Sequence, residues 1–155
     1  GTVGSRRVPG RRAPPAFPRG LFSTRVRVGS DDEALAALEA PPREVVVDQG
    51  EPATGAPCDS PVVTEDVSAT VVEQRVDACA AGVVVLADAW YPGWNVEVDG
   101  QPAEALRAWG FVRAVRVSAG SHSIRWRYQP TSFRLGAAVS LLALLAAALS
   151  LISRR

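Results

Sequence analysis

The residues best suited to binding chemistry form one aromatic stretch, Asp88-Ala89-Trp90-Tyr91-Pro92-Gly93-Trp94. Because Pro92-Gly93 bends the chain, the three rings would form a rigid apolar platform with polar edges. Such a platform can stack on sugar rings, and it also suits the boundary between a bilayer and water. In the alternative interpretation the stretch is a packed corner between strands, with Trp94 in the core. We favour this alternative because a domain with only four Phe residues needs its Trp side chains inside.

Patterns that would support catalysis are missing from the sequence. A nucleophilic triad needs a base beside its nucleophile, and the one His, His122, is flanked by Ser121 and Ser123. Adjacent residues of a strand point to opposite faces, so neither serine suits His122, which we interpret as a solvated turn residue. Helix capping accounts for Asp31-Asp32-Glu33, a strand end accounts for Glu65-Asp66, and no glycine-rich phosphate loop is present. The sequence therefore predicts no catalytic residue and no enzyme activity for this chain.

The two cysteines, Cys58 and Cys79, occur without a CxxC or Cys/His pattern. This spacing does not suit a metal site, and we expect no metal and no other cofactor. Outside the cytoplasm the pair could form a disulfide, and closing a loop of about 20 residues would contribute roughly 3 kcal/mol. Two free thiols are the favoured alternative, because the sequence does not show that the cysteines meet.

Charge is strongly segregated along the chain, although the total is only +1. Residues 1–27 carry seven Arg and no acid, residues 28–106 have a net charge of −14, and residues 107–155 carry eight Arg and no acid. Acidic and basic strands could pair across one sheet. Alternatively, the basic part could face anionic lipid headgroups or a phosphate-bearing lipid substrate. We expect no nucleic-acid partner, because aromatic residues do not alternate with the arginines.

The amino-terminal part is expected to contain a linker and a small unit. Residues 1–20 are rich in Arg, Pro and Gly, and a chain without Met that begins at Gly1 is expected to be a fragment or a processed product. Residues 21–50 predict a strand-helix-strand unit, whose helix begins at a capping box, Ser30-Asp31-Asp32-Glu33. Its three elements are Leu21–Val28, the helix Asp31–Ala40 and Glu44–Asp48.

Short strands recur over residues 51–132 and predict a mainly β fold, an antiparallel β-sandwich of jelly-roll type. We expect Val98-Asp99-Gly100-Gln101 to be a tight hairpin turn, since Asp-Gly tolerates positive φ angles, and Ala119-Gly120 to mark a second hairpin. The predicted strands are Val62–Glu65, Ala69–Ala78, Val83–Ala87, Trp94–Val98, Glu104–Ala108, Phe111–Val117 and Ser123–Tyr128.

Residues 133–155 are predicted to form a transmembrane helix with a short basic tail. Leu135–Ile152 contains 18 residues without a charge. As a helix it would span about 27 Å, close to the thickness of the hydrocarbon core. It is apolar on every face, and a β-domain of this size could not enclose it. Arginines occur on both sides of the segment, so they do not decide its orientation.

Several motifs, in their order along the chain, resemble the end of the bacterial YfhO-type membrane proteins. The motifs are LADAWYPGWNVEVDG (86–100), LRA (106–108), SAGSH (118–122) and WRYQPTSFRLG (126–136). The match is strong over roughly residues 83–152 and weaker back to about residue 14. The chain departs from the family at Ala108-Trp109-Gly110-Phe111, where relatives tend to have a polar, Tyr-containing segment, so no role is carried over to those positions.

The resemblance implies a multi-spanning glycosyltransferase that uses polyprenyl-phosphate sugars and modifies cell-envelope polymers or lipids. The β-domain would lie outside the cytoplasm at the bacterial cell membrane, next to an amino-terminal membrane domain of the parent protein. In enzymes of that architecture the catalytic acid lies in an early extracytoplasmic loop, and no position here matches it. Two hypotheses follow: a non-catalytic module that positions a glycan acceptor, or a membrane-anchored surface domain for adhesion or scaffolding. The candidate glycan- or interface-binding residues are Asp88, Trp90, Tyr91, Trp94 and Arg107.

Overall fold

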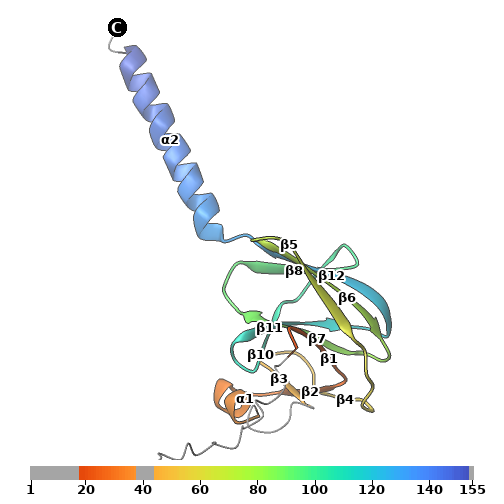
Figure 1. Ribbon diagram of the computed structural model, residues 1–155. Coiled ribbons are helices and arrows are strands. Elements are labelled where there is room, and N and C mark those ends of the chain that lie inside the picture. The colour runs from red at the N-terminus through yellow and green to blue at the C-terminus, as the bar shows by residue number, and fades with distance from the viewer. Residues whose placement is uncertain (1–17, 38–43, 154–155) are drawn as a thin grey trace, which may run out of the picture.

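The structure is a computed structural model that describes residues 18–37 and 44–153, and its strands form two sheets (Figure 1). The larger sheet contains β1 (Gly20–Ser23), β2 (Arg25–Val28), β3 (Val45–Val47), β4 (Ala53–Thr54), β7 (Gly82–Ala89), β10 (Leu106–Ala108) and β11 (Val112–Val117). Its strand order is β1-β7-β11-β10-β3-β2-β4. The smaller sheet contains β5 (Val62–Ser68), β6 (Val71–Ala78), β8 (Trp94–Val98), β9 (Gln101–Ala103) and β12 (Gly120–Tyr128), in the order β5-β6-β12-β8-β9.

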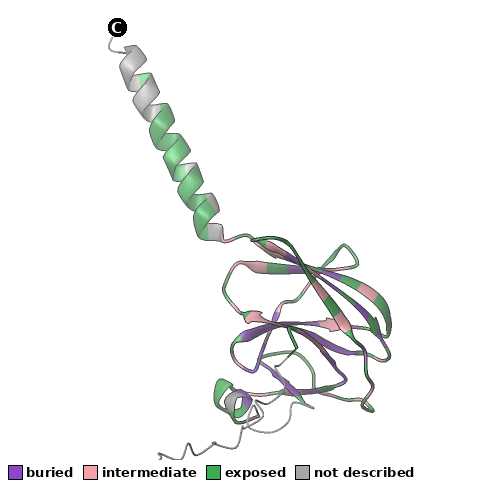
Figure 2. Ribbon diagram, in the orientation of Figure 1, coloured by how far each residue is buried: buried purple, intermediate pink, exposed green. Residues whose placement is uncertain are grey.

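Strand β7 holds the two halves of the core together. Its run Val83-Val84-Val85-Leu86 is apolar without alternation, which is typical of a strand covered on both faces. Val84 and Leu86 pack with residues of the smaller sheet, including Ile124 and Trp126, in the core between the sheets. Val83 and Val85 point the other way, into a second core that the larger sheet makes with itself. The mainly β, two-sheet prediction is therefore confirmed, and the buried residues concentrate in these strands (Figure 2).

The larger sheet curls into a half-barrel, which the prediction of an antiparallel sandwich did not include. Strand β2 contacts β7 although the two are not neighbours in the strand order. In addition, β2 and β3 are parallel, so the sheet is mixed. The reason is the short helix α1 (Asp31–Ala37), which connects the two strands and covers their apolar side.

The strand-helix-strand unit is present as β2, α1 and β3, and its helix begins at the predicted capping box. The predicted first strand, Leu21–Val28, is instead two strands, because β1 pairs with β7 and β2 with β3. The Glu33 amide donates to Ser30 Oγ at 3.4 Å, and the Ser30 amide donates to the Glu33 carboxylate at 2.8 Å. The Ser30 amide and, next, the Ser30 hydroxyl, which donates to the same carboxylate at 3.2 Å, lower the pKa of Glu33. The predicted last turn of the helix, residues 38–40, lies outside the described residues, as do residues 1–17 of the predicted linker and the basic tail 154–155.

One predicted hairpin is confirmed and the other is wrong. Asp99 and Gly100 have φ angles of 53° and 78°, and β8 and β9 pair through Val98 and Gln101 around them. Strand β9 is not among the predicted strands, and it contains Pro102, a residue that sheets admit mainly in edge strands. At Ala119-Gly120, however, β11 pairs with β7 and β10 whereas β12 pairs with β6 and β8. The chain crosses from one sheet to the other there, because turn residues set a change of direction but not the sheet that the next strand joins.

The carboxy-terminal segment is helical, and α2 (Thr131–Ser153) projects away from the β-domain (Figure 1). The helical part of the prediction for Leu135–Ile152 is therefore confirmed. Within the part of the chain that the structure describes, no helix is both long and apolar enough to cross a membrane. The membrane-spanning part of the prediction is thus not confirmed by the structure. The described α2 residues are exposed (Figure 2).

Candidate functional site

The predicted aromatic stretch begins at an irregularity of β7. Arg113 of β11 pairs with Leu86, but the preceding residue, Val112, pairs with Ala89. Ala87 and Asp88 therefore have no partner on β11 and form a β-bulge. A bulge bends its strand and redirects the side chains within it. Here it places the Asp88 carboxylate among basic side chains from distant parts of the chain.

Asp88 accepts hydrogen bonds from two guanidinium groups. Arg19 donates through Nε at 3.0 Å and through Nη2 at 2.8 Å, and Arg113 donates through Nη2 at 2.9 Å. The same Arg19 holds Asp66 of β5 with two bonds of 2.8 Å. These bonds lower the pKa of Asp66 and raise the pKa of Arg19. Arg19 thus ties the edge of the smaller sheet to the bulge of the larger one.

Arg113 is buried although it is charged, and aromatic rings surround it. Its guanidinium carbon lies 3.7 Å from the centroid of Trp94 and 5.6 Å from that of Trp126. Burial lowers the pKa of Arg113, while Asp88 acts in the opposite direction. Within the described residues its Nε and Nη1 have no hydrogen-bond partner. One carboxylate and the faces of two Trp rings therefore compensate the loss of water around this cation.

Trp90, Tyr91 and Arg107 lie nearer the surface. Trp90 is half-buried, its amide donates to the carbonyl of Phe111 at 2.8 Å, and Arg107 lies 5.7 Å from its ring centroid. Tyr91 is 59% exposed. Arg107 is held by Asp31 at 3.1 Å, and its amide donates to Asp48 at 2.9 Å. Arg107 is therefore fixed beside Trp90 rather than free to follow a ligand.

The five predicted site residues thus divide into two groups. Asp88 and Trp94 are engaged in the bulge and with Arg113, as expected for the packed-corner interpretation. Trp90, Tyr91 and Arg107 remain accessible, and a role in sugar binding stays a prediction for them. Sequence reasoning missed Arg19, which falls in the segment predicted as a linker, and Arg113. Neither has a local motif that would have indicated its partner, since Arg19 is 69 residues from Asp88.

The aromatic loop is also clamped to the chain that leads into α2. The Gln129 amide donates to the Gly93 carbonyl at 2.7 Å, and the Trp94 and Tyr128 rings lie 5.2 Å apart. Gly93 has a φ of +107°, and a Cβ there would lie 2.9 Å from Pro130 Cα. Only glycine fits both constraints. The loop therefore fixes where α2 leaves the β-domain.

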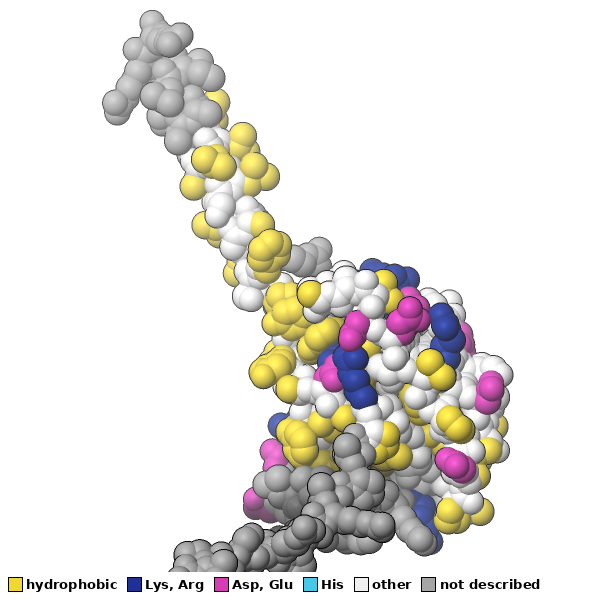
Figure 3. Space-filling view, in the orientation of Figure 1, with side chains coloured by type: hydrophobic (Ala, Val, Ile, Leu, Met, Phe, Trp, Pro, Cys, Tyr) yellow, Lys and Arg dark blue, Asp and Glu magenta, His cyan; other side chains and the backbone are white. Residues whose placement is uncertain are grey.

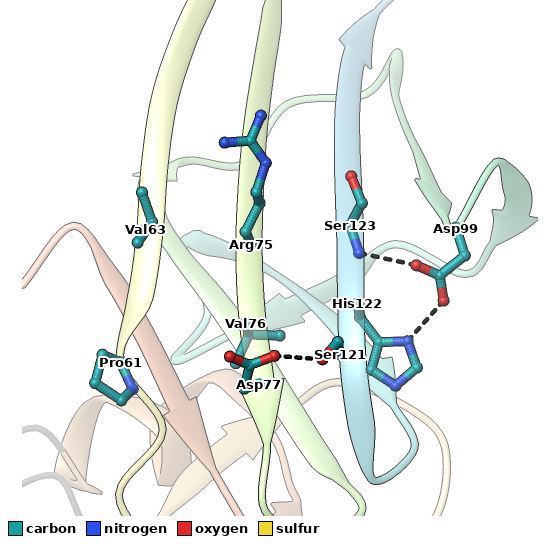
Figure 4. Close-up of a pocket in the computed structure, with 9 residues that line it drawn as sticks. All are labelled: Pro61, Val63, Arg75, Val76, Asp77, Asp99, Ser121, His122 and Ser123. Carbon is teal, nitrogen blue, oxygen red and sulfur yellow. Dashed lines mark hydrogen bonds and ion pairs between the residues drawn. The ribbon is translucent and has the colours of Figure 1, made fainter.

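A second polar cluster surrounds His122 at the other end of β12, beside a shallow groove of about 460 Å³ (Figure 4). His122 Nδ1 lies 2.7 Å from Asp99, and Nε2 lies 3.1 Å from the Ser118 hydroxyl. The interpretation of His122 as a solvated turn residue is therefore wrong, because it lies in β12 and its side chain is 11% exposed. Its serine partner is neither of the adjacent Ser121 and Ser123 but Ser118, which precedes the crossing between the sheets. The residues lining the groove are Pro61, Val63, Arg75, Val76, Asp77, Asp99, Ser121, His122 and Ser123.

This Ser-His-Asp cluster is better explained as a structural clamp than as a catalytic triad. His122 Nε2 also lies 3.2 Å from the Ser118 carbonyl oxygen, which can only accept a hydrogen bond. A proton on Nε2 that serves this carbonyl prevents the ring from acting as the base for Ser118. Asp99 also accepts from the Ser123 amide at 2.8 Å. The cluster therefore holds the Asp99-Gly100 turn against β12.

The clamp predicts a depressed pKa for Asp99. The Ser123 amide and, next, His122 stabilise the carboxylate and hold its pKa below the ordinary value of an Asp side chain. Because the pKa is lower in the folded protein than in the unfolded chain, this stabilisation is present above about pH 4 and is lost as the pH falls through the folded value. An NMR titration of the Asp99 carboxyl should give a midpoint below that of an ordinary Asp. In His122→Gln the midpoint should rise but stay depressed, and an unchanged ordinary value in the parent would contradict the clamp.

Cys58 and Cys79 form a disulfide, so the favoured expectation of two free thiols was wrong. The cysteines are 21 positions apart, the segment between them includes all of β5 and β6, and pairing of these two strands brings the cysteines together. The sequence separation alone does not show this. Within the described residues there is no group of His, Cys, Asp and Glu that could hold a metal ion.

Removing the disulfide should lower the free energy of unfolding by roughly 3 kcal/mol, because the loop that it closes gains entropy in the unfolded chain. Urea denaturation of a Cys58→Ser, Cys79→Ser variant would measure the loss. Adding a reductant to the parent chain should reproduce it, and should leave the variant unchanged. A reductant-insensitive parent would contradict the bond.

Comparison with known proteins identifies the family. No curated protein and no solved structure matches the chain. The sequence model of the family described as bacterial membrane protein YfhO matches residues 58–140, from Cys58 of the disulfide through β5 to β12 and into α2. The match includes the bulge, the aromatic loop and the His122 clamp, and it covers more than half of the sequence. The chain therefore belongs to the YfhO family of bacterial membrane proteins.

Proposed function

We propose that this chain is a non-catalytic extracytoplasmic β-module and that α2 anchors it in the bacterial membrane. In this proposal the module belongs to a multi-spanning glycosyltransferase that uses polyprenyl-phosphate sugars, and it braces that enzyme or positions its glycan acceptor. The observation that carries the proposal is the continuity of β12 with α2, whose sequence from Leu135 to Ile152 contains no charge. A helix of 23 residues is about 34 Å long, enough for a hydrocarbon core of about 30 Å.

The exposed side chains of α2 support the anchor. After the first turn, the large apolar ones are Leu135, Val139, Leu141, Leu142, Leu144, Leu145 and Leu149. At 100° per residue these positions span an arc of about 220°, and exposed small uncharged residues occupy the rest, so a single protein surface could not cover them. The acyl chains of a bilayer could cover all of them at once.

The disulfide supports the extracytoplasmic location, because such bonds persist in oxidising compartments. A non-catalytic role is supported by the carboxylates of the site, since Asp88 pairs with Arg19 and Arg113, and Asp99 with His122. To test the anchor, the chain would be produced in bacteria and membranes washed with alkaline carbonate. We expect the protein to stay with the lipid and to float with liposomes. Complete release into the wash would contradict the proposal.

A carbohydrate-binding role is the second candidate, and the exposure of Tyr91 beside Trp90 favours it. Exposed faces of aromatic rings can stack on sugar rings, and the Arg107 guanidinium would donate hydrogen bonds to the sugar hydroxyl groups. Cell-wall oligosaccharides titrated into the chain should change Trp fluorescence at millimolar concentration, and Trp90→Ala should abolish the change. Phe111→Ala, a nearby exposed ring, is the matched control. No response in the parent chain would remove this candidate.

A further inference from the structure

The end of the β-domain nearest α2 is an uncharged rim built from three separate segments. Tyr128, the last residue of β12, donates its amide to the Thr70 carbonyl at 2.9 Å, which places the turn between β5 and β6 beside the start of α2. The bond from Gln129 to Gly93 places the aromatic loop there as well. We define the rim as Val67, Ala69, Tyr91, Pro92 and Phe133.

The rim exposes large apolar side chains where a water-facing loop would be polar. Val67 is 50%, Tyr91 59% and Phe133 75% exposed. No charged residue occurs in residues 67–71, 90–94 or 128–133, although charged residues make up 21% of the chain. Hydrophobic side chains gather at the base of α2 in the space-filling view (Figure 3).

The opposite end of the same strands has the opposite character. That end carries Asp77, Asp99 and His122: the Ser121 hydroxyl donates to Asp77, and His122 pairs with Asp99 (Figure 4). Val63 of β5 is also exposed, but it lies among these polar groups, whereas the segments at the end where α2 begins expose apolar side chains without charged residues among them. Contiguous exposed apolar surface on a folded domain marks a contact with a protein or a membrane.

We infer that this rim rests on the lipid surface, at the boundary between headgroups and acyl chains, with Tyr91 and Phe133 as its anchors. The inference rests on the proposed function, in which α2 enters the bilayer. A bilayer around α2 would lie against the segments beside the start of the helix, and these are the turn between β5 and β6 and the aromatic loop. Tyr is enriched at this boundary because it combines an apolar ring with a polar hydroxyl, and Phe133 adds exposed apolar area. The rim has no carboxylate that anionic headgroups would repel.

Strand β5 offers a matched control for the rim. Val63 and Val67 are the same residue type, both are exposed, and they lie four residues apart, about 13 Å along the strand. Val63 lines the groove near His122 and is directed toward the far end of the strand. Lipid contact at Val67 but not at Val63 would therefore locate the bilayer surface at the rim.

The test uses a photo-crosslinking amino acid at one position at a time in the chain reconstituted in nanodiscs of phosphatidylethanolamine and phosphatidylglycerol. Positions 67 and 91 test the rim, position 63 is the control, and position 142 in α2 reports on the anchor. We expect lipid adducts at positions 67, 91 and 142, and a yield of lipid adducts no higher than background at position 63. Retention of the disulfide in each variant verifies folding.

The other outcomes separate the two proposals. Adducts at 142 without adducts at 67 and 91 would overturn the rim and leave the anchor intact. Equal yields at 63 and 67 would also overturn the rim, because contact would then be non-specific, and so would protein adducts in place of lipid adducts at 67 and 91. Absence of adducts at 142 would instead contradict the proposed function.

Discussion

Asp88→Ala should lower the free energy of unfolding by about 3–5 kcal/mol, because it leaves the buried Arg113 cation without its carboxylate. Arg113 is 2% exposed, and among the described residues Asp88 is its one hydrogen-bonded partner of opposite charge. The neighbouring Trp rings compensate only part of its lost hydration, since a cation–π contact contributes about 0.5–2 kcal/mol. Urea denaturation followed by near-ultraviolet circular dichroism would measure the loss.

Asp66→Ala provides the matched control, since Asp66 binds the outer side of the same Arg19 but is 58% exposed. Exposed ion pairs contribute only about 0–1 kcal/mol, so this variant should be close to the parent. Arg113→Leu in the Asp88→Ala background should recover part of the loss, because no buried charge remains. Equal losses of unfolding free energy in Asp66→Ala and Asp88→Ala would contradict the role of Asp88 as the carboxylate that compensates the buried Arg113.

Replacing Leu142 and Leu145 by Arg should remove the chain from the membrane fraction. On biological insertion scales an Arg near the centre of a helix costs about 2.5–3.5 kcal/mol, and each lost Leu removes a further 0.3–0.6 kcal/mol, roughly 6–8 kcal/mol in all. The nine branched aliphatic residues of Leu135–Ile152 contribute only about −3 to −5 kcal/mol. Insertion should therefore become unfavourable, and carbonate extraction should release the double variant.

The same charge placed on the β-domain should have no such effect. Val63→Arg adds an Arg at an exposed position of β5 and should stay with the membrane like the parent chain. Release of this control would show that added charge, rather than its position in α2, causes extraction. Retention of the Leu142, Leu145 double variant would show that α2 does not hold the chain in lipid.

Elements whose signals are local could be predicted from the sequence. The capping box of α1, the strand Trp94–Val98 and the Asp99-Gly100 turn depend on residues within a few positions of one another, and the structure has them as expected. Ile124 and Trp126 are two positions apart in the predicted strand Ser123–Tyr128, a spacing that puts both side chains on one face, and both lie in the core. In each case the physical cause acts over one turn or one strand.

Features that depend on contacts between distant segments could not be predicted. The bulge places Asp88 between Arg19 and Arg113, and the distances of these arginines along the sequence carry no signal. Trp109 is buried with a φ of +48°, a conformation that a bulky residue adopts only when its surroundings require it. The disulfide and the crossing at Gly120 likewise follow from which strands pair, and that is decided by the whole fold.

The membrane anchor is tested most directly by locating one residue of the β-domain and one residue after α2 relative to the membrane. The chain contains no Lys, so a single introduced Lys provides a unique side-chain amine for a membrane-impermeant label. Gln101→Lys and Arg155→Lys would be exported behind a cleavable signal peptide, and the unsubstituted chain would give the background from its terminal amine. We predict labelling at position 101 in intact cells, and at position 155 only after the membrane is permeabilised. Labelling of both positions in intact cells, with the protein free of the membrane, would contradict the account.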